Sequence, residues 1–130
     1  MKLLLDTHTF LWLVEGNPNL TAAARAGLAD PANELFLSIA SIWELAIKIS
    51  SPKPQLTLTD PLDAYIAKWP AIYQLNLLPI QLPHALYVVG LPNHHRDPCD
   101  RILIAQALVE GMTLVSGDSK FTSYPVTILW

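Results

Sequence analysis

Short apolar runs alternate with longer helical patterns in the first half of the chain. The runs Lys2–Leu5 and Leu35–Ser38 have the length of buried strands and end in turn or capping residues. Each is followed by apolar residues at helical spacing, over Thr9–Glu15 after the first run and over Ile39–Ile49 after the second. This alternation of strand and helix is typical of βαβ units, in which the strands lie parallel.

The second half of the chain adds further strand and helix patterns. Helices are predicted over Leu82–Val89 and over Pro98–Glu110, which Gly111 ends. The predicted strands are Leu75–Leu78, Met112–Ser116 and Val126–Leu129. We therefore expect an α/β fold with a central, mainly parallel sheet of four to five strands that helices cover on both faces.

Two more helices connect these units. They are predicted over Thr21–Ala29 and Pro61–Trp69, with Thr21 and Asp60 as N-caps. The Ser50–Pro54 segment contains two prolines and is expected to be an exposed turn. A chain of 130 residues, of which 52% are hydrophobic, is long enough to fill one core. Because no repeat or linker interrupts the pattern, residues 1–130 are expected to form a single domain.

The charge balance bears on the partners of the protein. Only 15% of the residues are charged, and the net charge is -3. A low charged fraction with a high apolar content predicts a homodimer or a larger homo-oligomer. The acidic balance argues against a nucleic-acid binder that uses a broad basic face. It does not exclude a nuclease, because bound divalent cations invert the local field around clustered carboxylates.

Cysteine content and hydropathy bear on the cellular compartment. Cys99 is the only cysteine, so an intramolecular disulfide cannot form. Asp6 interrupts the apolar start of the chain well before it reaches the length of a signal peptide. The longest apolar stretches, such as Leu35–Ile42, fall far short of the roughly 20 residues that a membrane helix needs. We therefore expect a cytoplasmic protein without a membrane span.

Four acidic residues stand at equivalent places relative to the predicted strands. Asp6 directly follows the first strand, and Asp118 follows the fourth. Glu44 lies in the first turns after the second strand, and Asp100 lies in the first turn of its helix. The carboxyl ends of parallel strands meet at one edge of a sheet, where such folds bind ligands. We therefore expect these four side chains to converge.

Each acid also has a structural interpretation, which the sequence leaves open. Asp6 suits the N-cap of the first helix, and Asp97 suits an N-cap followed by Pro98 at the first helical position. The segment Ser41-Ile42-Trp43-Glu44 fits a capping box, and Gly117-Asp118 fits a turn. The joint arrangement favours a functional site, because converging carboxylates repel one another and destabilise the fold unless cations neutralise them.

The chemistry of the expected cluster follows from its donor atoms. Carboxylate oxygens select hard cations such as Mg²⁺ or Mn²⁺. These ions suit phosphodiester hydrolysis, because one ion can activate water and a second can stabilise the leaving 3′ oxygen. This reaction needs no protein nucleophile.

Five motifs, most of which contain one of these acids, run nearly from one end of the chain to the other. They are Leu3-Leu4-Leu5-Asp6-Thr7-His8, Ser38-x-x-Ser41-x-Trp43-Glu44, Leu78-Pro79-Ile80 with His84-Ala85, His94-His95-Arg96-Asp97-Pro98-x-Asp100-Arg101 with Ile104-Ala105-Gln106-Ala107, and Leu114-Val115-Ser116-x-Asp118. In order and spacing they resemble the PIN-domain toxins of VapBC toxin-antitoxin systems. This match of several motifs is far more specific than any single Asp-Thr or Gly-Asp pair.

The resemblance implies a three-layer α/β/α fold and a Mg²⁺-dependent endoribonuclease that cleaves RNA and is held inactive by a cognate antitoxin. It also implies four catalytic metal ligands, with Asp97 as an auxiliary. By position these ligands are Asp6, Glu44, Asp100 and Asp118. Two positions depart from the pattern of these toxins: Cys99 stands where they usually have Phe, and Ser51–Pro54 replaces a usual Gly-Lys. Both departures bear on packing or on a loop more than on the acids.

The loop that contains His94 and His95 admits more than one interpretation. Adjacent histidines suggest zinc, but no cysteine or third histidine stands at ligand spacing, which argues against such a site. With Arg96 and Arg101 the pair is instead expected to form a loop that meets the phosphate of the substrate, although a solvated turn is the structural alternative. Ser116, which follows a strand, is a further candidate for a contact with substrate, water or a metal ligand.

Two competing functions stay open at this point. Asp6 at the end of a strand also suits a metal-dependent phosphatase with an aspartyl nucleophile. Such sites have a second Asp two positions later, where this chain has His8. The other alternative is a non-catalytic, receiver-like or protein-interaction domain, which needs no metal and would tolerate loss of Glu44 and Asp118.

Overall fold

The computed structural model describes residues 1–130 and contains a five-stranded sheet in which every pair of neighbouring strands is parallel. The order of the strands across the sheet is β3-β2-β1-β4-β5. The strands are β1 (Lys2–Leu5), β2 (Glu34–Ser38), β3 (Leu75–Leu78), β4 (Thr113–Val115) and β5 (Ile128–Leu129). The predicted parallel α/β fold is therefore confirmed.

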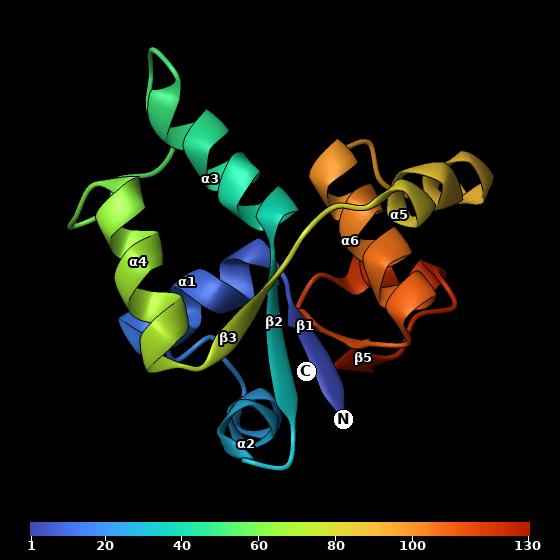
Figure 1. Cartoon of the computed structure of the whole chain (residues 1–130), viewed down its shortest axis with the longest axis horizontal. Helices are drawn as coiled ribbons and strands as arrows, with labels where there is room; N and C mark the ends of the chain where they lie inside the picture. The colour runs from blue at the N-terminus through green and yellow to red at the C-terminus, as the bar shows by residue number, and fades with distance from the viewer.

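Helices cover both faces of this sheet (Figure 1), with α1 and α4 on one side and α5 and α6 on the other. The α-helices are α1 (Thr7–Glu15), α2 (Ala22–Ala29), α3 (Ile39–Ser50), α4 (Leu62–Ile72), α5 (Leu82–Tyr87) and α6 (Pro98–Glu110). Two short 3₁₀ helices, η1 (Val88–Gly90) and η2 (Ser119–Ser123), follow α5 and β4. None of these helices has the length and hydropathy needed to cross a membrane.

The central strand β1 divides the core into two apolar clusters. Its side chains alternate between the faces of the sheet, so Leu3 and Leu5 pack into one cluster and Leu4 packs into the other. The first cluster includes Phe10 of α1 and the second includes Ile104 of α6. Because all three leucines of β1 are fully buried, this strand is apolar on both faces, as the interior strand of a parallel sheet requires.

Two predictions about α4 were wrong. Asp60 does not cap the helix; Pro61 occupies the N-cap position, and no side chain hydrogen-bonds there. The helix also continues past the predicted end at Trp69 through Pro70 to Ile72. Proline removes one backbone donor from a helix, but Pro70 is itself buried, so the packing of its ring offsets part of that loss.

The predicted start of α3 at Ile39 is confirmed, and the alternative interpretation of Ser41-Ile42-Trp43-Glu44 as a capping box does not hold. The N-cap is Ser38, the last residue of β2, whose side chain accepts a hydrogen bond from the backbone N–H of Ala40. The helix therefore begins directly at the end of the strand, and Ser41 and Glu44 lie within it. Two other elements are shorter than predicted. The helix α5 ends before Val88, where η1 begins, and the last strand is only Ile128–Leu129, which pairs with β4.

The order of the strands locates the place where side chains can converge. From β1 the chain adds β2 and β3 on one side and then β4 and β5 on the other. Open α/β sheets bind ligands at such a reversal point, outside the carboxyl ends of the strands. Asp6 follows β1 here and Ser116 follows β4, and the two strands are neighbours.

Candidate metal centre

Asp6 is both a helix cap and a member of the acidic cluster. One carboxylate oxygen, Oδ1, accepts a hydrogen bond from the backbone N–H of Thr9 at 2.8 Å, which caps α1. The other oxygen, Oδ2, accepts from the hydroxyl of Ser116 at 2.5 Å. The side chain is thus held at the end of β1 with little freedom, and only 7% of the residue is exposed.

Ser116 joins Asp6 to a second acid. Its Oγ donates to Asp6 and accepts a hydrogen bond from the backbone N–H of Asp118 at 3.1 Å. Gly117 lies between Ser116 and Asp118, and a Cβ at that position would meet the ring of Trp130 at 2.6 Å, so a larger residue would require this ring to move. A pocket of about 300 Å³ opens beside this turn. Its lining residues are Asp6, His8, Thr9, Trp12, Gly117 and Asp118.

The start of α6 brings two more acids to the same place. Asp97 is the N-cap, because its Oδ1 accepts from the backbone N–H of Cys99 at 2.8 Å, and Pro98 occupies the first helical position. Both features were predicted. Asp100 lies in the first turn of α6, and a donor atom of Asp100 and one each of His95 and Asp118 lie within 4.8 Å of one another.

The electrostatics of Asp100 show how close the acids are. Burial, followed by the charges of Asp97, Glu44, Asp118 and Asp6, raises the pKa of the Asp100 carboxyl from 3.8 to about 7. Every other acid of the predicted set therefore acts on Asp100 through space. The expected convergence of the acids is met in the folded chain, and it leaves the metal-free cluster with unfavourable repulsion.

Glu44 reaches the cluster from α3. The residue is 8% exposed, and its Oε1 lies 3.7 Å from the ammonium of Lys48, one turn later in the helix. The other oxygen, Oε2, is buried and has no hydrogen-bond partner. Because an unpaired buried carboxylate oxygen destabilises a fold, Glu44 gives an independent sign that a cation belongs here.

The residues present fit a divalent cation. Several carboxylates converge, one of them keeps a buried oxygen without a partner, and another has a pKa raised by burial and by its acidic neighbours. A larger pocket, of about 440 Å³, lies between α3 and α4, but Asp60 is its only ionisable side chain. The cluster at the ends of β1 and β4 is therefore the candidate divalent-metal site of this protein.

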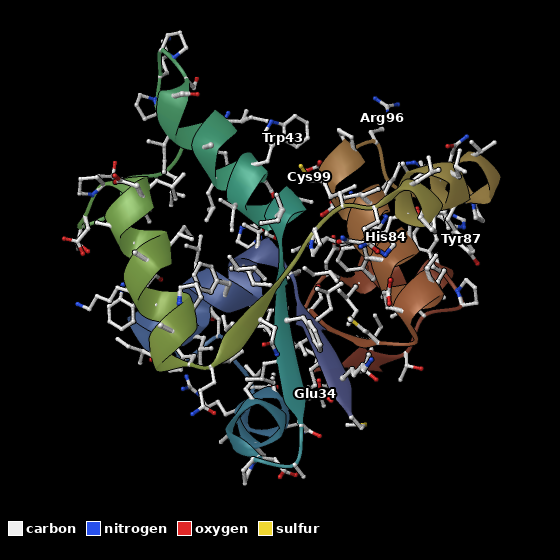
Figure 2. All side chains as sticks on the ribbon, viewed as in Figure 1. Glu34, Trp43, His84, Tyr87, Arg96 and Cys99 are labelled. Atoms are coloured by element: carbon white, nitrogen blue, oxygen red, sulfur yellow. The ribbon has the colours of Figure 1, made fainter.

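The structure distinguishes the two arginines that the sequence assigned to substrate. Arg96 is exposed and extends away from the loop before α6 (Figure 2). The guanidinium of Arg101 instead donates to the backbone carbonyls of Pro92, Val88 and Leu91. These bonds tie the loop to α6, which favours a structural role for Arg101 over phosphate binding.

Cys99 behaves as a small buried hydrophobe. It lies in the first turn of α6, between that helix and α3 (Figure 2), and is 3% exposed. Burial, together with the charges of Asp97, Glu44 and Asp100, raises the pKa of its thiol to about 12. The thiolate needed for nucleophilic chemistry is therefore disfavoured.

Sequence reasoning missed the position of His95. Its ring is buried and its Nε2 lies 3.3 Å from Oδ2 of Asp118, whereas the sequence predicted a loop that meets phosphate. The sequence signal that could have placed His95 near the acids is its position in the motif His94-His95-Arg96-Asp97, directly before the acids of α6.

The chain is similar to known proteins in sequence and in fold. The family model of the PIN domain matches residues 3–126. Ribonuclease VapC22 of Mycobacterium tuberculosis is 28% identical over 130 residues, which cover 96% of each protein. The fold is similar to that of VapBC2 from Rickettsia felis bound to a DNA fragment from its promoter, with a TM-score of 0.72, 18% identity, and coverage of 98% of this chain and 97% of that one. DNA-bound VapBC from Salmonella typhimurium gives a TM-score of 0.66 at 19% identity, with 98% and 96% covered.

Proposed function

This chain belongs to the PIN-domain family, and on that premise we propose that it is a divalent-metal-dependent endoribonuclease and the toxin of a type II toxin-antitoxin pair. The observation that carries the proposal is the burial of Asp100 among other carboxylates: burial first, and then the charges of the neighbouring acids, raise the pKa of that side chain to about 7. The similarity to a ribonuclease along nearly the whole chain supports the same activity.

The proposed cofactor is Mg²⁺ or Mn²⁺, because an oxygen-rich site prefers hard cations. Asp6, Asp100 and Asp118 would hold the ion, with Glu44 beside them. Asp97 would contribute as an auxiliary, since one of its oxygens already caps α6. When bound, the ion supplies the positive charge that lowers the pKa of water and offsets negative charge at the phosphate.

The chain's own residues orient the site. The hydroxyl of Ser116 and the backbone N–H of Thr9 each donate to Asp6, so this carboxylate is fixed before substrate arrives. We assign Ser116 this orienting role in place of direct substrate binding. The side chain of Asp118 is 38% exposed, so it faces the side from which RNA would approach. Arg96, exposed at the neighbouring loop, is proposed to contact an RNA phosphate.

The proposed reaction adds water across a P–O bond of RNA. The attacking water forms the new bond to phosphorus, the bond to the 3′ oxygen breaks, and that oxygen takes up a proton. The products are a 5′-phosphate and a 3′-hydroxyl. The neighbouring 2′-hydroxyl takes no part, which distinguishes this reaction from metal-independent cleavage through a cyclic phosphate.

The proposed partners are RNA and a cognate antitoxin. Structures similar in fold are toxin-antitoxin complexes, and an acidic cluster without metal is a ready partner for an Arg or Lys side chain of an inhibitor. RNA as the substrate makes the cytoplasm the proposed compartment. We further propose that residues 1–130 act as one domain, since both apolar clusters share β1, and that the protein self-associates.

The phosphatase alternative fits the site less well. Such a phosphatase has a second Asp two positions after the first, and this chain has the exposed His8 there. No second function is proposed.

RNA cleavage by the purified, antitoxin-free protein tests the proposal. Cleavage is expected to stop on exhaustive chelation with EDTA and to return with Mg²⁺ or Mn²⁺. The fragments are expected to carry 5′-phosphates, and a 2′-O-methyl group at the cleavage site should be tolerated chemically. An Asp118→Asn variant, purified in parallel, excludes a contaminating nuclease. Cleavage that survives chelation, or fragments that end in cyclic phosphates, would overturn the proposal.

A further inference from the structure

His95 occupies a buried position beside the acidic cluster. Its ring stacks on Phe121 at a centroid distance of 4.7 Å, and 7% of the residue is exposed. One ring nitrogen, Nε2, lies 3.3 Å from Oδ2 of Asp118, and the other, Nδ1, lies 3.2 Å from the hydroxyl of Tyr124. Both nitrogens are therefore engaged, one by an acid of the cluster and the other by a residue outside it.

Tyr124 determines which nitrogen of His95 carries the proton. The hydroxyl oxygen accepts hydrogen bonds from the backbone N–H groups of His94, at 3.2 Å, and of His95, at 3.1 Å. These two bonds use both of its lone pairs, so the oxygen accepts nothing more. Its single proton is left to donate, and Nδ1 of His95 is the acceptor within reach. Nδ1 therefore carries no proton, and a neutral ring carries its proton on Nε2.

We propose that His95 is a positioning residue for Asp118, with Tyr124 fixing the ring so that its Nε2–H donates to Oδ2 of the carboxylate. The inference rests on the proposed function in one respect: it has a catalytic consequence only where Asp118 holds a metal ion. The backbone N–H of Lys120 donates to the other oxygen, Oδ1, at 2.9 Å. Two donors of fixed position thus orient a side chain that is 38% exposed and would otherwise sample several rotamers.

Direct ligation of a metal ion by His95 is the competing explanation. Donor atoms of His95, Asp100 and Asp118 lie within 4.8 Å of one another, which is close enough for a shared ion. Ligation through Nε2 needs a lone pair on that nitrogen and hence a proton on Nδ1. That proton would point at the oxygen of Tyr124, which already accepts two N–H groups, and the hydroxyl proton would lose its acceptor. Because Tyr124 is buried, water does not readily replace the lost bonds.

The tautomer of His95 in the metal-free protein tests the proposal without any assay of activity. Long-range ¹H–¹⁵N correlation spectra separate the two neutral tautomers, and a His95→Phe variant, which keeps a ring over Phe121, assigns the signal among the four histidines. The expected result is a proton on Nε2 and none on Nδ1, unchanged when the site is saturated with Mg²⁺. A proton on Nδ1, or a change of tautomer on Mg²⁺ binding, would overturn the proposal.

Mn²⁺ affinity measured by calorimetry gives the functional readout. Partners that orient a metal ligand typically change metal affinity by 10- to 100-fold, so His95→Phe is expected to weaken Mn²⁺ binding on the order of 10-fold. His95→Gln places an amide N–H near the position of Nε2 and is expected to restore most of the affinity. The matched control is His94→Phe, since only the backbone of the exposed His94 hydrogen-bonds to Tyr124; its affinity should equal that of the wild type.

The variants test the positioning role of His95 separately from the proposed ribonuclease activity. Equal Mn²⁺ affinities for wild type, His95→Phe and His95→Gln would overturn the role of His95, even if RNA is cleaved. If His95→Phe does not fold, His95→Gln, which also lacks the imidazole, assigns the signal of His95, and the wild-type tautomer decides. The expected tautomer and Mn²⁺ affinities in a protein that cleaves no RNA would count against the ribonuclease and leave the positioning of Asp118 intact.

Discussion

Replacing Asp100 by Asn removes a carboxylate whose negative charge is unfavourable in the metal-free fold. Burial and the charges of neighbouring acids raise its pKa from 3.8 to about 7, so its ionisation is more costly in the folded than in the unfolded chain. The Asp100→Asn variant keeps the size of the side chain and removes the charge. Its free energy of unfolding at pH 8 without metal is therefore expected to exceed that of the wild type.

The size of the effect follows from the change in pKa. A change of about 3 corresponds to about 4 kcal/mol at full ionisation, which is an upper bound. Solvent reaches part of the Asp100 side chain, and screening by water and salt reduces the electrostatic contribution. We expect a measured stabilisation of roughly 1–2 kcal/mol at pH 8 after this discount.

The sign of the pH dependence is fixed by which state holds the proton. Between pH 3.8 and about 7 the unfolded chain has released the proton of Asp100 while the folded chain retains it. The wild type therefore loses stability as the pH rises through this window. Asn has no proton to lose, so the advantage of the variant is expected to be smallest near pH 4 and to be complete at pH 8.

Urea unfolding followed by tryptophan fluorescence measures the effect, with EDTA at several pH values and again with Mg²⁺. An ion at a concentration of about 100 times its dissociation constant raises the free energy of unfolding of the protein that binds it by about 2.7 kcal/mol. Mg²⁺ should therefore cancel or reverse the stability advantage of Asp100→Asn. Asp60→Asn, which alters an exposed acid before α4 and outside the cluster, is the control and should leave the stabilisation by Mg²⁺ unchanged. If Asp100→Asn is less stable than the wild type in EDTA at pH 8, or if its advantage does not grow with pH, the reasoning fails.

Three further predictions concern the neighbouring residues and the partners. Asp97→Asn, whose side chain still caps α6, is expected to reduce Mg²⁺-dependent cleavage less than Asp100→Asn; the reverse ranking in rate measurements would make Asp97 the primary ligand. The cognate antitoxin is expected to inhibit through an Arg or Lys side chain at the acidic cluster, and inhibition that survives replacement of each such residue would contradict this. Light scattering at micromolar concentration is expected to show a homodimer or larger assembly, and a monomer would refute the prediction.

Local sequence predicted those parts of the fold that depend on local patterns. The run Leu3-Leu4-Leu5 forms a strand buried on both faces, and α6 begins at Pro98 and ends before Gly111, as expected. The errors fall where tertiary packing decides. Pro70 predicts the end of a helix by local rules, yet α4 runs through it because its ring is buried. Ser41 and Glu44 match a capping box by local rules, but both lie within α3, which begins at Ile39 as its apolar pattern predicted.

The acids could be located from sequence because their positions follow from strand ends alone. Asp6 comes directly after β1 and Asp118 comes three residues after β4, and the ends of parallel strands share one edge. The role of His95 could not be found in this way. Its partners Asp118 and Tyr124 lie 23 and 29 residues later in the chain, and only the folded loop brings them to its ring.

The central claim is that the converging carboxylates hold the cation that RNA cleavage requires. Mn²⁺ binding, followed by electron paramagnetic resonance, and cleavage of a fluorescent RNA can be measured in the same samples as the Mn²⁺ concentration rises. We predict that the cleavage rate follows the bound Mn²⁺ in the wild type, and that Asp6→Asn, with its fold retained, loses both. Cleavage without bound Mn²⁺, or full cleavage by folded Asp6→Asn, would contradict the claim.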